Sequence, residues 1–206
     1  MAVTGFVMFG FVVGHMVGNL QVFAGDGGVK LNAYAAFLKN TPALLWGTRI
    51  VVGLSLVLHV WAAATLKRLS NEARPVQYKM RKDIQASVPS RNMFWGGISL
   101  LFYVIYHLLH LTVGVASPIA GTFSHDNVYG NMVASFQNPA LVGVYVFAMI
   151  ALGMHLYHGL YSLFQTLGLN HPGYMPRIRT GAKVFGALIA LGFSSMPVAI
   201  LLGAVK

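Results

Sequence analysis

Residues 139–167 read PALVGVYVFAMIALGMHLYHGLYSLFQTL and contain no Asp, Glu, Lys or Arg. A helix needs about 20 apolar residues to cross the hydrocarbon core of a bilayer, so this stretch is long enough to span a membrane. It also carries His155 and His158 well inside the apolar run, where an imidazole is costly unless something binds it. The stretch therefore predicts a membrane-spanning helix with a functional histidine.

The whole chain has the composition that this stretch suggests. Of its 206 residues, 56% are hydrophobic and only 9% are charged, whereas a typical soluble domain has about 25% charged residues. The predicted spans lie at about residues 1–23, 43–66, 92–116, 139–167 and 182–205. We expect one all-α membrane domain over residues 1–206, a bundle of five transmembrane helices.

The first predicted helix is expected to be retained rather than cleaved as a signal peptide, because no basic segment precedes it and no small-residue cleavage site follows it. Its glycines at positions 10, 14 and 18 repeat every four residues. Such spacing lets another helix, or a flat macrocycle, approach the backbone closely. Both interpretations of the stripe are open from the sequence.

Two features predict how the bundle ends at the membrane surface. Leu31, Ala35 and Leu38 are spaced as on one face of a helix, which favours a short helix along the outer surface. Trp46 and Trp95 lie close to predicted helix ends, where aromatic belts form.

Basic residues are concentrated in two of the predicted connections. Ten of the 14 lie there, namely Lys67, Arg68, Arg74, Lys79, Arg81, Lys82 and Arg91 in one and Arg177, Arg179 and Lys183 in the other. The positive-inside rule places both connections and the N-terminus in the cytoplasm and the C-terminus outside. Topology and anionic membrane lipid explain the net charge of +10, so we expect no nucleic-acid partner. The expected location is a bacterial cytoplasmic membrane.

The chain has no cysteine, which excludes disulfides, thiolate-bound iron–sulfur clusters and covalently attached haem. Any haem would therefore be of the non-covalent b type. The acidic residues Asp26, Glu72, Asp83 and Asp126 are all expected in loops. No carboxylate is expected within the membrane.

Four histidines lie deep in the predicted helices. His15 and His107 are 14 and 15 residues from the starts of two helices that run outward, whereas His59 and His155 are each 16 residues from the starts of two helices that run inward. At a rise of about 1.5 Å per residue, these positions form two pairs at matched depth, one in each half of the membrane.

Two pairs of histidines at matched depths are the arrangement that two bis-histidine haems need. Two neutral imidazoles fill both axial positions of a haem iron, exclude oxygen and leave a one-electron carrier. We therefore expect two b-type haems, one held by each pair. Interhelical hydrogen bonding would explain a single buried histidine, and zinc would need carboxylates, thiolates or a closer ligand cluster.

His110 and His158 leave the ligand assignment open, because each follows another histidine by three residues. That spacing is about 60 degrees around a helix and about 4.5 Å along it, so either member could be the ligand. The other member is expected near the haem or packed between helices. Arg49, inside the second helix, could bind a haem propionate or a quinone carbonyl, or extend to the outer head groups.

Five segments carry a resemblance to a known family: MAVTG at 1–5, GHMVGNL at 14–20, LHVW with LKRLSNEARPVQY within 58–78, YHLLHLT at 106–112 and HLYHGLYSLFQTLG at 155–168. In order and spacing they resemble the dihaem cytochrome b membrane anchor of succinate dehydrogenase and fumarate reductase, in its single-subunit, five-helix form. The resemblance spans nearly the whole chain.

The resemblance implies that His15, His59, His107 and His155 are the axial ligands. In the segment HLYHG the family's ligand is the histidine four residues before the glycine, which favours His155. His107 matches by its place before Leu108.

The resemblance also implies partners. A flavoprotein subunit and an iron–sulfur subunit would dock at the basic inner face and carry out the succinate chemistry, which this chain would not catalyse by itself. Electrons would pass by the inner and outer haems to a quinone, expected to be menaquinone. The chain departs from the family in two ways. It has no acidic residue within the membrane, so the resemblance implies no quinone site or proton route. It also has no basic segment before its first helix, a feature that bears on docking at the inner face.

Two other functions remain open from the sequence. The cytochrome b subunit of a formate dehydrogenase or hydrogenase would fit the same histidines. A haem-free transporter would also bury histidines, although broken helices and inverted repeats, which are typical of transporters, are not evident.

Overall fold

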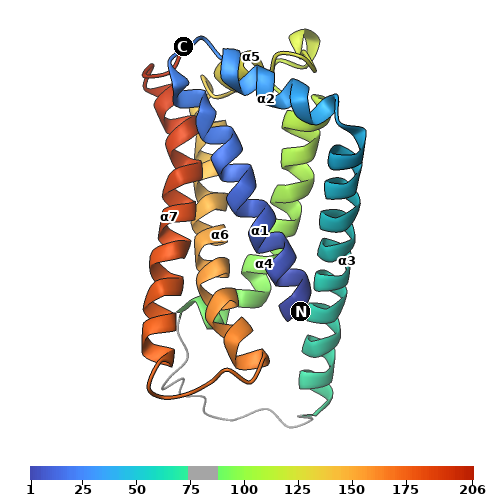
Figure 1. Cartoon of the computed structure of the whole chain (residues 1–206), viewed down its shortest axis with the longest axis vertical. Helices are drawn as coiled ribbons and strands as arrows, with labels where there is room; N and C mark the ends of the chain where they lie inside the picture. Colours follow the sequence, from blue (N-terminus) through green and yellow to red (C-terminus); the bar gives the residue numbers. More distant parts are fainter. Residues whose placement is uncertain (74–87) are drawn as a thin grey trace.

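The computed structural model, described for residues 1–73 and 88–206, is a bundle of helices (Figure 1). The five long helices are α1 (Ala2–Asn19, continued by a 3-10 turn at Leu20–Ala24), α3 (Pro42–Glu72), α4 (Val88–His107, continued by a π-helical turn at Leu108–Val113), α6 (Pro139–Thr166) and α7 (Met175–Leu201). Each is long and apolar enough to cross a membrane. The described ranges contain no strand, so the prediction of an all-α bundle with five helices long and apolar enough to span a membrane is confirmed.

Two short helices lie across one end of the bundle, which is the end that also holds the C-terminus (Figure 1). They are α2 (Val29–Lys39) and α5 (Val128–Ser135), and a 3-10 turn at Ala120–Thr122 precedes α5. Helix α2 confirms the prediction of a short helix in the connection between the first two long helices. Helix α5 was not predicted, because it has eight residues and so too few turns to show a periodic apolar face.

The predicted start of the last long helix is wrong. Helix α7 begins at Met175 rather than at about residue 182. Pro176 lies in its first turn, where a helix needs no N–H donor from the residue. Arg177, Arg179 and Lys183 are therefore on the first turns of the helix and not in a loop. Long basic side chains can cover apolar surface there while their charges stay in water.

In the connection between the second and third long helices, several residues that were expected in a loop also lie on helices. Lys67 and Arg68 lie on the last turns of α3, and Arg91 lies in the first turn of α4. Glu72, expected in a loop, is the last residue of α3 and lies 3.6 Å from the Arg68 guanidinium. The remaining charged residues of this connection, Arg74, Lys79, Arg81, Lys82 and Asp83, are outside the described residues.

The tightest helix pair is α6 with α7. A Cβ atom added at Gly153 would lie 2.7 Å from the carbonyl oxygen of Gly186, and one added at Gly186 would lie 2.4 Å from that of Gly153. Only glycine allows two backbones to approach this closely. Side chains from both helices, among them Tyr145 and Ile200, continue into a buried core under α2 and α5.

Helix α3 packs differently from this pair. Ser55 is its only fully buried residue, and its contacts are mainly with α1 and, at the outer end, with α2. Large apolar side chains such as Ile50, Leu54 and Trp61 are exposed. Much of the apolar surface of α3 is therefore free to contact lipid or another apolar group.

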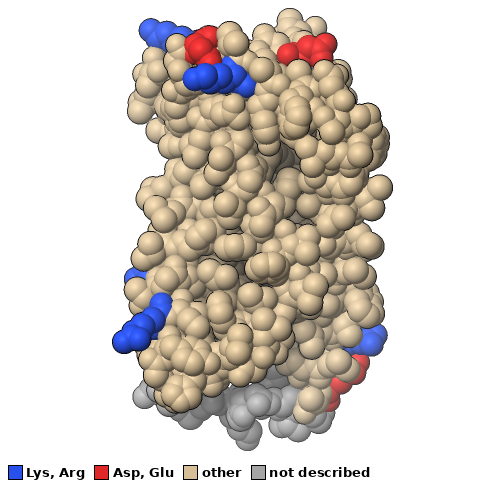
Figure 2. Space-filling view, in the orientation of Figure 1, with Lys and Arg blue, Asp and Glu red and all other residues tan. Residues whose placement is uncertain are grey.

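Charged side chains gather at the two ends of the face shown in Figure 2 and leave an uncharged band between them. Such a band is what a hydrocarbon layer requires, because a charged side chain at the bilayer centre is costly. The sequence, the helix lengths and the surface thus agree on an integral membrane protein.

Candidate metal centres

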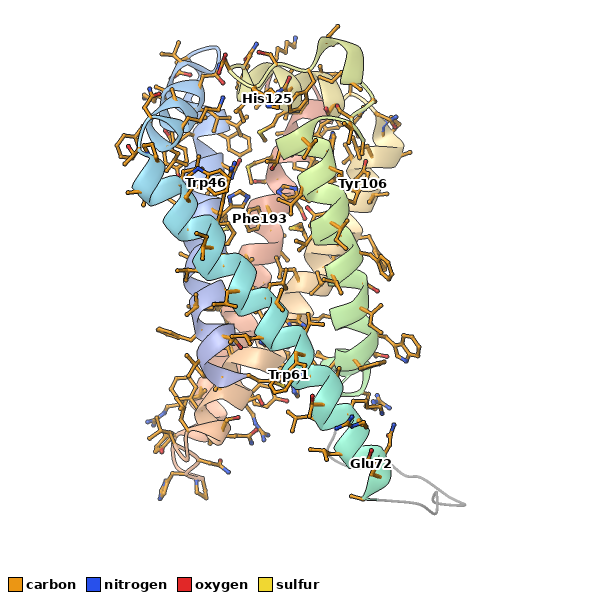
Figure 3. All side chains as sticks on the ribbon, turned by 90° about the vertical axis from the view of Figure 1, so that its right-hand side faces the viewer. Trp46, Trp61, Glu72, Tyr106, His125 and Phe193 are labelled. Atoms are coloured by element: carbon orange, nitrogen blue, oxygen red, sulfur yellow. The ribbon has the colours of Figure 1, made fainter. Side chains whose placement is uncertain are left out.

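The outer histidine pair joins α1 and α4. The ring centres of His15 and His107 are 5.9 Å apart, and their planes are nearly perpendicular at 86°. Phe193 of α7 lies 5.9 Å from the His15 ring, and Tyr103 lies 5.8 Å from the His107 ring. Phe193 and Tyr106 mark this level in the upper half of Figure 3.

The inner histidine pair joins α3 and α6. The ring centres of His59 and His155 are 6.3 Å apart, with 57° between their planes. Trp61, two residues beyond His59, marks the lower level in Figure 3. The four histidines thus form the two pairs that the depth count predicts. Each histidine comes from a different helix.

Two glycines lie beside the inner pair, each at a distance at which an added Cβ would make an ordinary van der Waals contact with a histidine ring. A Cβ atom added at Gly5 would lie 3.5 Å from the His59 ring, and one added at Gly97 would lie 3.8 Å from the His155 ring. In addition, Nδ1 of His155 is buried and has no hydrogen-bond partner among the described residues. A buried ring nitrogen without a partner costs free energy, unless it binds a group that the protein chain does not supply.

The spacing within each pair fits two imidazoles on opposite sides of one metal ion. An imidazole nitrogen ligates a transition metal at about 2 Å, and the ring centre lies about 1 Å behind the nitrogen, so two such rings have centres about 6 Å apart. The observed distances are 5.9 Å and 6.3 Å. The described residues contain no cluster of three or more His, Cys, Asp or Glu that could hold a metal. A site with two protein ligands fits a metal whose other ligands come from a macrocycle, such as haem.

The π-helical turn at Leu108–Val113 separates His110 from His107. His110 is completely buried, and its ring contacts Tyr106, Phe136 and Tyr145. No second imidazole faces it at the distance seen in the two pairs. His107 and His110 share one neighbour, the hydroxyl of Tyr145, but only His107 also faces His15. The sequence carries no clear signal for this turn, so the spacing of His107 and His110 does not by itself show which of them faces His15.

His158 also differs from its neighbour His155. Its Nδ1 lies 2.9 Å from the hydroxyl of Tyr161 on the same helix. The Tyr161 ring lies in turn under the guanidinium of Arg179, at 5.4 Å. His158 therefore has partners within the chain and belongs to neither pair.

Arg49 is exposed, and its guanidinium lies 5.0 Å from the ring centre of Trp46. The sequence did not predict Trp46 as the cation–π partner of Arg49. Trp46 lies at about the level of Phe193 and Tyr106 in Figure 3, so the Arg49 contact is formed in the same half of the bundle as the pair of His15 and His107.

The glycine stripe of α1 has two different environments. A Cβ atom added at Gly18 would lie 2.6 Å from the ring of Tyr34, whereas Cβ atoms added at Gly10 or Gly14 would meet no described atom within 4 Å. Close packing within the described chain therefore explains Gly18 but not the other two glycines.

Comparisons of the chain with protein-family models, with characterised proteins and with solved structures find no match. The geometry of the site and the sequence resemblance are therefore the basis for a function.

Proposed function

We propose that the chain is a membrane-embedded cytochrome b with two b-type haems, held by His15 with His107 and by His59 with His155. The observation that supports this most strongly is the pairing itself, with ring centres 5.9 Å and 6.3 Å apart at two depths of one bundle. When bound, an iron with two imidazole ligands supplies reversible one-electron chemistry without binding oxygen.

Within this class, we propose that the protein is the membrane anchor and electron-transfer subunit of a succinate:quinone oxidoreductase. It would pass electrons between an iron–sulfur subunit and a membrane quinone, with menaquinone as the expected quinone. The five segments of sequence resemblance support this choice, because they include all four proposed ligands together with their neighbours. Succinate itself would react on a flavoprotein subunit.

The basic ends of α3, α4 and α7 support the proposed assembly. They lie at the end of the bundle opposite α2, α5 and the C-terminus (Figure 1). By the positive-inside rule this end faces the cytoplasm of a bacterium. The pair of His59 and His155 is the nearer one to this end, so it would be the first to exchange electrons with a docked iron–sulfur subunit.

The proposed assembly is tested by purifying the tagged full chain from its native membrane and identifying the proteins that accompany it. The expected partners are a flavoprotein and an iron–sulfur protein, and added succinate should reduce the cytochrome absorbance. A molybdenum or nickel enzyme in their place would indicate another quinone-linked dehydrogenase. A chain without haem absorbance would contradict the cytochrome proposal and favour the transporter.

A further inference from the structure

We infer that Thr4 and Tyr145 are positioning residues that hold one histidine of each proposed pair in the orientation and tautomer that ligation needs. Thr4 acts on His59 and Tyr145 on His107. This inference rests on the proposed function, because it assumes that these histidines ligate a metal.

Thr4 is placed on α1 so that its hydroxyl lies between two groups. Its Oγ1 donates a hydrogen bond to the carbonyl oxygen of Met1 at 3.0 Å, and it lies 3.1 Å from Nδ1 of His59 on α3. A hydroxyl has one hydrogen to donate, and here it is directed to the Met1 oxygen. The oxygen is then left to accept from His59, which requires the ring proton on Nδ1. Nε2 of His59 is the nitrogen with a free lone pair.

Tyr145 of α6 has the same arrangement at the outer pair. Its hydroxyl lies 2.7 Å from Nδ1 of His110 and 3.4 Å from Nδ1 of His107. The histidine tautomers set the direction of both contacts. In the arrangement that we propose, the hydroxyl donates to His110 and its oxygen accepts from His107. His107 again carries its proton on Nδ1 and has Nε2 free. His110 would then carry its own proton on Nε2, which is buried and has no hydrogen-bond partner among the described residues.

A hydrogen bond at the second ring nitrogen has a known effect on a metal-bound histidine. It fixes the tautomer and the plane of the ring, and it makes the ring a stronger electron donor to the metal. Stronger donation stabilises the oxidised iron more than the reduced iron. Removal of either hydroxyl should therefore raise the reduction potential of one haem and leave the other unchanged.

The test uses the full chain, assembled with haem in membranes, in wild-type form and as Thr4→Val and Tyr145→Phe variants. A redox titration followed by absorbance measures both haems, and His155→Ala identifies the inner one by its loss. Thr4→Val should raise the potential of the inner haem alone. A net hydrogen bond changes the equilibrium constant by up to about tenfold, which is about 59 mV for one electron. Tyr145→Phe should raise the potential of the outer haem by less, because its bond to His107 is longer.

Matched variants separate this role from general effects on structure. Thr4→Ser keeps the hydroxyl and should keep the wild-type potential. Thr180→Val removes a similar bond, from Oγ1 to the Pro176 carbonyl at 3.1 Å, and should shift neither haem. Tyr103 contacts the ring of His107, but its hydroxyl bonds no histidine in the described chain, so Tyr103→Phe should shift the outer haem less than Tyr145→Phe.

The inference is overturned if Thr4→Val and Tyr145→Phe bind both haems at wild-type potentials, or if each shifts both haems equally. A Thr4→Val variant that loses the inner haem alone, while Thr4→Ser retains it, supports the inference. If Thr4→Val does not assemble, the smaller Thr4→Ala is measured in its place. A wild-type chain that binds no haem would instead contradict the proposed function, so the two failures are distinguishable.

Discussion

His155 and His158 show how strongly the surroundings of a residue determine its role. Both lie on α6 and both are half-buried. His155 faces His59 and has a buried ring nitrogen without a partner in the described chain, whereas His158 is bonded to Tyr161. The difference identifies His155 as the proposed ligand.

We therefore expect His155→Ala to lose the inner haem and keep the outer one. His158→Ala removes an imidazole with its own hydrogen-bond partner, so this variant should keep both haems. The measurement is the haem content per chain of each purified variant. Retention of two haems by His155→Ala would transfer the ligand role to His158 or to another donor.

The same comparison can be made on α4. His107→Ala should lose the outer haem, because His107 faces His15. His110→Ala should keep the haem but destabilise the bundle by about 1–3 kcal/mol, because it leaves the buried hydroxyl of Tyr145 without its close partner. Haem content and thermal unfolding in detergent measure the two effects. Loss of haem only in His110→Ala would reverse the assignment.

At the level of residues, the sequence predicts which histidines lie at the same depth. It does not predict the hydrogen bonds that the neighbouring side chains make to them. Depth along a helix follows from counting residues, so His15 could be matched with His107 without a structure. The hydrogen bonds of Thr4, Tyr145 and Tyr161 depend on how the helices rotate about their axes, and a single sequence does not report this rotation. That the paired histidines ligate haem stays a prediction.

Among the elements, the pair α6 and α7 depends on contact between two glycines. Gly153→Ala or Gly186→Ala would force the backbones apart and destabilise the fold by about 1–3 kcal/mol. Gly159→Ala is the matched control, because a Cβ atom there meets no described atom within 4 Å. Thermal unfolding in detergent measures the difference. Equal unfolding temperatures for Gly153→Ala and Gly159→Ala would show that the contact is not limiting.

An exposed ion pair connects α2 with the turn before α5. Lys39 Nζ lies 3.0 Å from the carboxylate of Asp126 and also donates a hydrogen bond to the carbonyl oxygen of His125. The hydrogen bond from Lys39, together with its charge, holds the pKa of the Asp126 carboxyl below its usual value. A lowered pKa stabilises the folded state above the usual pKa of aspartate, and this contribution is lost as the pH falls through the lowered value.

We therefore expect Asp126→Asn to lower the unfolding temperature slightly at neutral pH, where the wild-type carboxylate is charged. The effect is small because the pair is exposed to solvent. The difference between variant and wild type should disappear once the pH falls below the lowered pKa of the wild-type Asp126 carboxyl, because the carboxyl is then protonated. A difference that persists at that pH would point to a contact other than the ion pair.

The elements themselves were largely predictable, and the errors have physical causes. Long apolar runs fix the five spans, since the bilayer sets their length. Arg177, Arg179 and Lys183 interrupt the apolar run, so the apolar pattern predicts a later start for α7 than the structure has, whereas a helix tolerates basic residues on its first turns. The π-helical turn after His107 and the short α5 depend on tertiary packing, which local sequence does not specify.

At the scale of the whole molecule, the chain exposes 12833 Å² of surface, whereas a compact soluble monomer of its mass exposes about 9,400 Å². Helix α3 contributes to this surface, because its residues are almost all exposed or half-buried. Such a bundle needs apolar material around it and between its helices. Lipid and a docked subunit would each cover part of this surface. A flat macrocycle between the two histidines of each pair would cover a further part.

The central claim is that this bundle holds two haems through four histidines. It is tested most directly by the ratio of non-covalently bound haem to chain in the purified full-length protein, measured on the wild type and on His155→Ala. The account predicts two b-type haems per wild-type chain and one per His155→Ala chain. Fewer than two haems in the wild type, or two in His155→Ala, would contradict it.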